Sequence, residues 1–227
     1  MMIESIVTIK SENPTNDGFG TGFVIYNDGQ GVFILTCKHV VDDVESPVVN
    51  ELFAQVISSS NTFDMTLLYV PKLNLKALPM QIDGCDSLEI DVIGFSLFNQ
   101  DYTQKKHIYA KLFKEPIELF SIETQQSFNA RKLKAKNNFR FSRGNSGSPV
   151  ICKESGKVIA MISNKEGRDI AYAVEVSYLS EIWKEIPNNL LQKKRKETKE
   201  EMTIARYVIA GAITLGIITA TYLFFYN

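Results

Sequence analysis

Three side chains of this 227-residue chain are of the types that acyl-transfer chemistry uses, in the order histidine, aspartate, serine. His39 follows the apolar run in 33-FILTCKHVVDD-43, so its ring can be held rigidly at a strand end. Asp64 precedes the apolar run of 63-FDMTLLYV-70, where a half-buried carboxylate needs a hydrogen-bond donor. An imidazole N–H supplies that donor and leaves the other ring nitrogen as a base. Ser146, in 144-GNSGSP-149, is the candidate nucleophile.

The glycines around Ser146 favour a loop that binds an oxyanion. Such a site needs two backbone N–H groups aimed at the developing negative charge, and the natural donors are those of Gly144 and Ser146. A residue other than glycine at position 144 would resist the required turn. Taken singly, a GNSG segment is commonly just a turn, a strand-end histidine is commonly structural, and an aspartate before a strand is often a cap. The three motifs in this order favour a catalytic triad. His107 has no such context and is expected to be a surface or linker residue.

The elements that must position these residues are mostly short strands. Runs of β-branched and aromatic residues, bounded by turn-forming residues, predict strands at 3–9, 22–26, 31–36, 65–70, 89–95, 111–119, 149–152, 158–163 and 170–176. This pattern indicates a sandwich or a barrel. One helix is predicted over 177–186, with Ser177 as N-cap and Pro187 as the stop.

The motifs resemble those of trypsin-like peptidases of the Deg/HtrA kind. The segment 18-GFGTGFVIYNDGQGVFILTCKHVVDD-43 is similar to their G-x-G-S/T-G strand, turn and second strand ending in T-x-x-HVV. FDMTLLYV resembles the strand that starts with their aspartate, and GNSGSPV resembles their GNSGGP loop. The segment 158-VIAMISNKEGRDIAYAVEV-176 resembles the hairpin that walls their specificity pocket. The resemblance covers about residues 1–186.

The resemblance implies an all-β fold. Two six-stranded antiparallel β-barrels of the chymotrypsin/trypsin type are expected at about 1–85 and 86–176, followed by the C-terminal helix 177–186. Together they would make up a peptidase domain over 1–186.

The resemblance also implies a role for each site residue. His39 is the general base, Asp64 orients it and Ser146 is the nucleophile, while Gly144 and Ser146 supply the oxyanion hole. Ser163 is expected on the strand that pairs with the substrate backbone. The chain departs from the family pattern at Ser148, which replaces a glycine, and at Asn145. Secreted, zymogen-activated members use an aspartate at the position of Asn145 to capture a new N-terminus, so activation by cleavage is not expected here.

Two interpretations of the specificity pocket stay open. Arg140 lies six residues before Ser146, where family members place the pocket floor. If Arg140 points into the pocket, an acidic side chain before the scissile bond is favoured. If it points to solvent, the pocket is bounded mainly by Phe141, Ser142, Ser163 and Ala171 and takes medium-sized apolar groups.

The C-terminal segment 204–226, IARYVIAGAITLGIITATYLFFY, predicts a transmembrane helix. About 20 apolar residues at about 1.5 Å rise span the roughly 30 Å hydrocarbon layer. The alternative, a buried core helix, is disfavoured because the segment follows a basic linker, 187–203, and carries no charge after position 206. The positive-inside rule then places the peptidase domain in the cytoplasm, with 204–226 as a single-pass C-terminal anchor in the bilayer.

Composition excludes several other classes of function. A net charge of −1 and a pI near 6.2 argue against a nucleic-acid binder. Three cysteines do not make a disulfide framework, and no Cys/His cluster suggests a metal. The proposed chemistry needs no metal and no cofactor. The sparse cysteines and the lack of a secretory signal favour a reducing compartment.

The sequence therefore predicts a membrane-tethered serine endopeptidase that acts on protein or peptide substrates through an acyl-enzyme. A regulatory protein partner is a further expectation. The first alternative is a catalytically silent trypsin-like pseudoprotease that acts as a peptide-binding or sensor module on the membrane. The second is a membrane effector in which 204–226 oligomerises into a pore, although this helix lacks the polar stripe that would line one.

Overall fold

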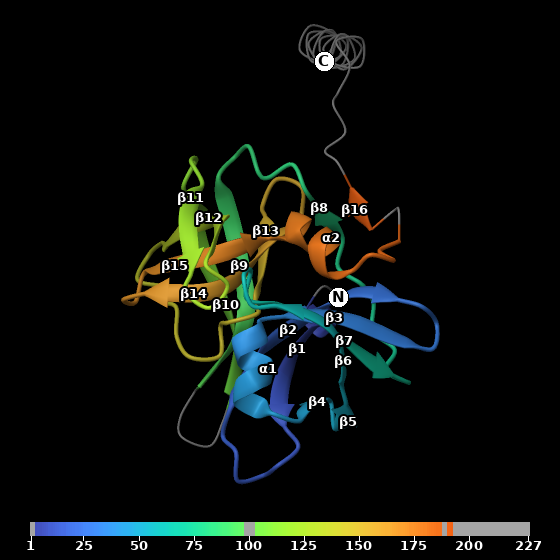
Figure 1. Ribbon diagram of the computed structural model, residues 1–227. Coiled ribbons are helices and arrows are strands. Elements are labelled where there is room, and N and C mark those ends of the chain that lie inside the picture. The colour runs from blue at the N-terminus through green and yellow to red at the C-terminus, as the bar shows by residue number, and fades with distance from the viewer. Residues whose placement is uncertain (1–2, 98–102, 188–189, 193–227) are drawn as a thin grey trace, which may run out of the picture. The chain divides into compact units, whose positions relative to one another are not determined.

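A computed structural model describes residues 3–97, 103–187 and 190–192, which are built mostly from β-strands in two sheets (Figure 1). Two short α-helices, α1 (Lys38–Val44) and α2 (Leu179–Ile182), lie between strands. Short 3-10 turns at Ile3–Ser5 and Val176–Tyr178 precede β1 and α2.

The first sheet is a curled half-barrel of seven strands in the order β5-β4-β1-β2-β3-β7-β6. Neighbouring strands in this sheet run antiparallel. Their bounds are β1 (Ile6–Ser11), β2 (Phe19–Asn27), β3 (Gly31–Thr36), β4 (Pro47–Val49), β5 (Leu52–Phe53), β6 (Gln55–Ser60) and β7 (Met65–Pro71). Buried side chains lie on both faces of this sheet, since Ile34 and Leu68 are paired and share one face while Phe23, paired with Leu35, lies on the other.

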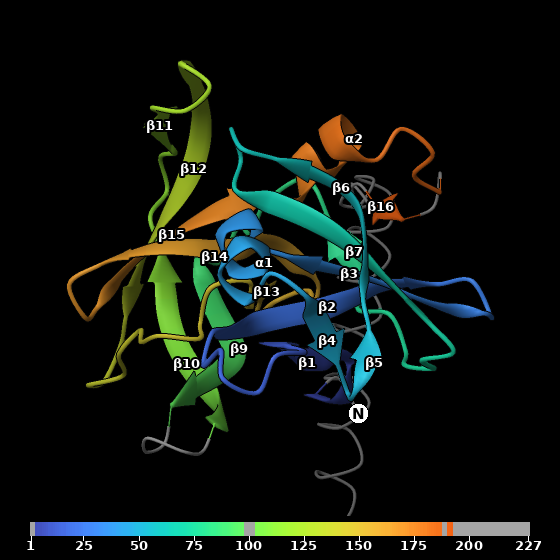
Figure 2. The same cartoon turned by 60° about the horizontal axis from the view of Figure 1, so that its bottom comes forward.

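The second sheet closes into a barrel, because β9 pairs with β10, and the pairing continues through β12, β15, β14 and β13 back to β9. The bounds of these strands are β9 (Glu89–Leu97), β10 (Thr103–Leu112), β12 (Gln126–Ala135), β13 (Pro149–Cys152), β14 (Val158–Glu166) and β15 (Ile170–Glu175). Three more strands, β8 (Met80–Gln81), β11 (Ile117–Ser121) and β16 (Leu191–Gln192), extend this sheet. Figure 2 shows β4 to β7 of the half-barrel to one side of α1, and β10, β12 and β15 of the closed barrel to the other.

The prediction of two closed six-stranded barrels is therefore confirmed for the second sheet and corrected for the first. Within the described residues no pairing joins β5 to β6, the two ends of the first sheet. Strands β4 and β5 have three and two residues, too few to support a closing ladder. The ladder of β6 with β7 is also shifted between Val56 and Ser58.

Two strands of the closed barrel, β10 and β12, were not predicted from the sequence. The strand predicted at 111–119 instead joins the end of β10 to the start of β11 across a turn. Both missed strands carry lysines and glutamine among their apolar residues, and burial falls on alternate positions such as Ile108, Ala110 and Leu112 of β10. Half of each strand faces solvent, so the apolar signal was too sparse to stand out.

The C-terminal helix is shorter than the predicted 177–186. The chain forms the 3-10 turn Val176–Tyr178 and then one helical turn, α2. Trp183 leaves helical geometry at φ −124° and ψ 91°, and its ring stacks on Phe33 with centroids 4.7 Å apart. This aromatic contact with the half-barrel ends the helix before Pro187 does.

The cysteines differ from expectation. Cys85 and Cys152 form a disulfide, which the odd, sparse set of three cysteines did not predict. The bond ties the segment before β9 to the end of β13 and so closes a loop over the barrel. Cys37 is unbonded and buried.

The described residues contain no helix that is long and apolar enough to cross a membrane. The predicted span 204–226, and all but a few residues of the predicted linker 187–203, lie outside the described residues.

Candidate active site

The candidate base, His39, lies in the first turn of α1, directly after β3. Cys37 is still extended (φ −78°, ψ 148°), so the chain turns into the helix just before the histidine. Val40, Val41 and Val44 are the buried residues of the helix, and they pack it against the half-barrel. Burial of these valines leaves the imidazole at the surface, with 40% of its side chain exposed.

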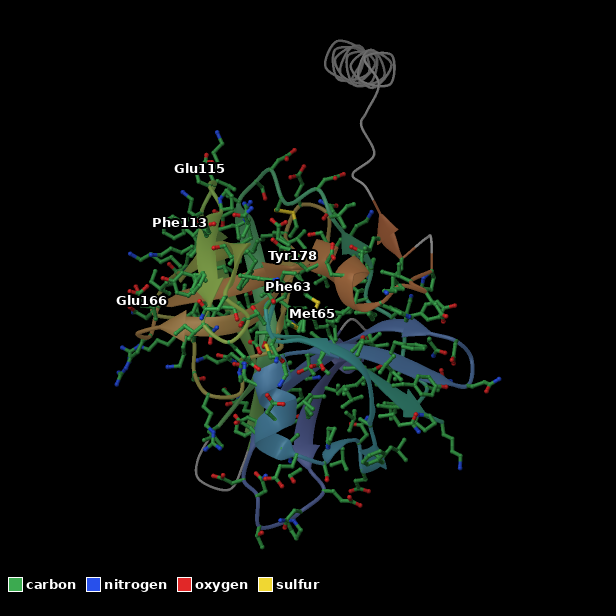
Figure 3. The ribbon with its side chains drawn as sticks, in the orientation of Figure 1. Phe63, Met65, Phe113, Glu115, Glu166 and Tyr178 are labelled. Atoms are coloured by element: carbon green, nitrogen blue, oxygen red, sulfur yellow. A yellow bond between two sulfur atoms is a disulfide. The ribbon has the colours of Figure 1, made fainter. Side chains whose placement is uncertain are left out.

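The candidate orienting acid, Asp64, sits in the turn between β6 and β7 with a left-handed backbone (φ 49°). Its two neighbours in the chain hold this turn in place. The ring of Phe63 stacks on Tyr178 with centroids 4.3 Å apart, and Met65 is fully buried (Figure 3). The strained backbone of Asp64 is therefore supported by packing on both sides.

Asp64 accepts three hydrogen bonds that hold it against the histidine. One carboxylate oxygen accepts the backbone N–H of His39 at 3.0 Å, and the other lies 2.8 Å from His39 Nδ1. The second oxygen also accepts the hydroxyl of Ser163. Because the carboxylate is an acceptor, Nδ1 carries the proton and Nε2 is left to act as a base.

The two ionisable groups shift each other's pKa. Burial works against the charged form of Asp64, but the hydrogen bond and charge of His39, helped by the Ser163 hydroxyl, outweigh it and lower the pKa of Asp64. Burial also works against the charged form of His39. The hydrogen bond and charge of Asp64, with the charges of Asp43 and Asp42, outweigh this effect and raise the pKa of His39 above 6.5.

The candidate nucleophile lies in a loop, just before β13, that is shaped by two glycines. Gly144 and Gly147 have φ values of +92° and +84°, which favour glycine. Asn145, only 2% exposed, braces the loop from inside. Its amide donates to the Phe95 carbonyl at 2.9 Å, and its side-chain oxygen accepts the Ser142 N–H at 2.8 Å.

The backbone donors expected of an oxyanion hole are available. Among the described residues, no acceptor is bonded to the N–H of Gly144 or of Ser146. The neighbouring amides are already used, since Gly147 N–H donates to the Ile162 carbonyl and Ser148 N–H to the Asn145 carbonyl. The loop therefore presents two unpaired N–H groups on either side of Asn145.

The hydroxyl of Ser146 is hydrogen-bonded to a group other than the base. It donates to the Ser163 carbonyl at 3.1 Å, and within the described part of the chain no hydrogen bond joins it to His39. The structure thus brings His39 and Asp64 into direct contact, and places Ser146 in the same pocket with its hydroxyl bonded to Ser163 and not to the base.

Ser148, which replaces a family glycine, is accommodated by a glycine elsewhere. Its hydroxyl is buried without a partner among the described residues. It packs against Gly94 of β9, where an added Cβ would lie 1.8 Å from the Ser148 oxygen. The side chain of Ser148 therefore fits only because Gly94, on the neighbouring strand, has none.

A pocket of about 290 Å³ opens beside these groups. Of the residues predicted for this site, it is lined by His39, Phe141, Ser142, Gly144, Ser146 and Ser163. Arg140 is exposed and Ala171 is fully buried, and neither lines the pocket. This arrangement agrees with the interpretation in which Arg140 points to solvent.

Sequence reasoning missed several residues that line the pocket: Phe19, Val40, Asp43, Arg143, Asn164 and Lys165. Val40, Arg143, Asn164 and Lys165 lie one or two positions from His39, Gly144 or Ser163, and Asp43 lies one helical turn after His39. Phe19 comes from the glycine-rich strand β2, and no sequence signal distinguishes it from a core phenylalanine. His107, as expected, lies outside the pocket, on β10 with Nε2 3.3 Å from Asp91.

Cys37 is a further titratable group beside the dyad. Its sulfur lies within 4.8 Å of ligand atoms of His39 and Asp64, a spacing that a metal ion could bridge. The thiol proton of Cys37 is instead used in a hydrogen bond to the Ile162 carbonyl at 3.1 Å. Burial, followed by the nearby charge of Asp64, raises the pKa of this thiol well above its usual value. Both effects favour a neutral packing role over metal binding.

The sequence of this chain matches a known family over most of the residues just described. Residues 20–161 match the model of the trypsin-like peptidase domain. The chain belongs to the trypsin-like peptidase family. No curated protein matches it closely enough to show a nearer relationship by sequence.

Solved structures of several proteases share its fold. The active form of the Rv3671c protease from M. tuberculosis is 20% identical, covers 79% of each chain and has a TM-score of 0.63. A serine endoprotease from Yersinia pestis is 16% identical, with a TM-score of 0.57 over 79% of this chain and 61% of that one. The HtrA-type protease AlgW with a tripeptide is 15% identical, with a TM-score of 0.62 over 79% of this chain and 58% of that one. At these identities the likeness is one of fold.

Proposed function

We propose that this trypsin-like peptidase is an active serine endopeptidase. In this mechanism Nε2 of His39 takes the proton of Ser146 as its hydroxyl attacks a peptide carbonyl, and later returns it to the leaving amine. Asp64 stabilises the imidazolium, and the N–H groups of Gly144 and Ser146 hold the oxyanion. No step of this reaction requires a cofactor.

The observation that carries the proposal is the joint presence of an oriented base and two unpaired amide donors beside one serine. The 2.8 Å contact between Asp64 and His39 Nδ1 selects the tautomer that can act as a base. The lining of a single pocket includes His39, Gly144 and Ser146. A loop with only a structural role would not need to leave two amides unpaired.

Hydrolysis of a quenched-fluorescent peptide library by the full-length protein in detergent tests the proposal. We expect cleavage by the wild type and none by Ser146→Ala or His39→Ala. Ser163→Ala, which removes another hydroxyl from the same pocket, is expected to weaken cleavage without abolishing it. Equal cleavage by wild type and Ser146→Ala would contradict the proposal.

A second candidate is the silent peptide-binding module, favoured by the hydroxyl of Ser146 donating to the Ser163 carbonyl. If this candidate is right, library peptides bind to the wild type with measurable fluorescence anisotropy but are never cut. Cleavage that depends on Ser146 would exclude it.

We further propose that 204–226 anchors the peptidase in a membrane with the domain on the cytoplasmic side. The apolar segment and its preceding basic cluster support this. In alkaline-washed membranes the full-length protein should stay in the pellet. Leu215→Arg combined with Ile218→Arg should release it, whereas Thr198→Arg, which adds charge to the linker, should not. Retention of the double variant would contradict the anchor.

A further inference from the structure

Thr21 lies on the half-barrel, yet it contacts the loop of the candidate nucleophile on the other sheet. It sits in β2 with none of its surface exposed. Its hydroxyl donates to the Gly144 carbonyl at 2.6 Å, and its N–H donates to the Ser146 carbonyl at 2.9 Å. One residue of the first sheet therefore holds the carbonyls of both residues that bear the oxyanion donors.

Every polar atom of Thr21 is used in this arrangement. The same hydroxyl accepts the Phe95 N–H at 2.8 Å, so its proton has to point at Gly144. Its carbonyl accepts the Thr36 hydroxyl at 2.7 Å. A fully bonded, buried side chain has one rotamer and one hydrogen direction, which makes it a rigid support.

The loop closes tightly on the Thr21 backbone. At Gly147 an added Cβ would lie 1.8 Å from the Thr21 carbonyl oxygen. The chain on the far side of Ser146 is thus packed against Thr21 as well.

These contacts limit how the oxyanion donors can move. Each residue has two soft torsions, φ and ψ. The Thr21 hydroxyl fixes the Gly144 carbonyl and with it the plane of the next peptide. Only the φ and ψ torsions of Gly144 separate this anchored plane from the preceding one, which carries the Gly144 N–H. The Ser146 N–H is set by its own peptide plane, whose Asn145 carbonyl accepts the Ser148 N–H at 3.0 Å. Without the Thr21 hydroxyl, the Gly144 donor loses its support.

We propose that Thr21 is a positioning residue that holds the oxyanion hole in its working shape from across the two sheets. This inference deepens the proposed peptidase function and rests on it for its catalytic consequence. Thr21 acts through Gly144 and Ser146 and need not touch substrate.

Thr21→Val and Thr21→Ser form a matched pair for the test. Valine keeps the shape and removes the hydroxyl, whereas serine keeps the hydroxyl and removes a methyl group. The first measurement is the rate of labelling of full-length protein by a fluorophosphonate probe, recorded as a rate constant and a final amplitude. A misplaced donor lowers the rate constant, while a misfolded fraction lowers the amplitude.

We expect Thr21→Val to label at least about tenfold more slowly at unchanged amplitude, since misplacement by about 1 Å can cost up to about a hundredfold in rate. Thr21→Ser should restore most of the rate. For peptide cleavage, Thr21→Val should lower kcat and leave KM nearly unchanged, because the oxyanion forms after substrate binds. Equal rate constants in all three proteins, or a loss confined to the amplitude, would overturn the inference.

A second measurement does not depend on activity. Hydrogen exchange of the peptide 140–148, followed by mass spectrometry, should be faster in Thr21→Val and close to wild type in Thr21→Ser. Unchanged exchange in Thr21→Val would overturn the inference even in an active enzyme. Exchange could be faster in Thr21→Val while the wild type neither reacts with the probe nor cleaves peptides. That result would support the role of Thr21 in shaping the loop and refute the proposed peptidase activity.

Discussion

Replacing Asp64 with asparagine tests how the dyad works, because the structure dictates which way the new amide must face. One oxygen of Asp64 accepts the His39 backbone N–H at 3.0 Å, so the amide oxygen of Asp64→Asn has to stay there. The NH2 group is then placed opposite His39 Nδ1, where the carboxylate now lies at 2.8 Å. It donates to Nδ1, and the single proton of the neutral ring moves to Nε2. The nitrogen that should accept the Ser146 proton is thereby blocked.

The expected cost is large, although the main rearrangement is that the Ser163 hydroxyl loses its acceptor and has to turn its proton elsewhere. A wrong tautomer of this kind lowers kcat by about 10⁴-fold, which corresponds to about 5.4 kcal/mol in activation free energy. The assay is kcat for peptide cleavage at alkaline pH, where His39 is neutral. Asp42→Asn is the matched control, since Asp42 is an exposed acid on α1 that raises the pKa of His39 without touching its ring. Its kcat should stay within a factor of about two.

Two outcomes would refute this reasoning. An Asp64→Asn enzyme within tenfold of wild type would mean that Asp64 does not select the tautomer. An equal loss in Asp42→Asn would mean that general electrostatics, and not the contact with Nδ1, supports the reaction.

Three more predictions concern pH, the loop and the disulfide. Because the pKa of His39 is raised in the folded chain, activity should fall as pH drops through this raised pKa, and Asp42→Asn should shift the fall in activity to lower pH. Stability depends on pH in the opposite direction. The stabilisation that His39 contributes is present below its unfolded pKa and is lost as pH rises through its folded pKa. Gly147→Ala should cost about 3 kcal/mol or more of unfolding free energy in urea titrations, because its Cβ would meet the Thr21 carbonyl at 1.8 Å, and an unchanged midpoint would contradict the loop geometry. Reduction of the disulfide, which spans 67 residues, should cost about 4 kcal/mol of stability, and equal melting temperatures with and without reductant would show that it contributes nothing.

The sequence predicted the parts of the site that are local in the chain. The motifs around His39, Asp64 and Ser146 lie next to strong apolar runs, so their strand ends could be located by pattern. The alternating strands β10 and β12 could not, because half of their residues face solvent as lysines and other polar side chains.

Contacts between distant segments were the part that could not be predicted. The hydroxyl of Thr21 meets the Gly144 carbonyl across 123 residues, and Cys37 meets the Ile162 carbonyl across 125. The exposed position of Arg140 likewise depends on how the second barrel closes, and six residues of sequence before Ser146 do not reveal it. The resting hydrogen bond of Ser146 with the Ser163 carbonyl is a rotamer choice, which the residue types leave open.

The most direct test of the central claim is to map the adduct of a fluorophosphonate on the folded full-length protein by peptide mass spectrometry. We expect a single phosphonate on Ser146, lost in His39→Ala as well as in Ser146→Ala, because an unassisted hydroxyl reacts too slowly. An adduct on another serine of the pocket such as Ser163, or no adduct on a protein that stays folded, would contradict the assignment of Ser146 as an activated nucleophile.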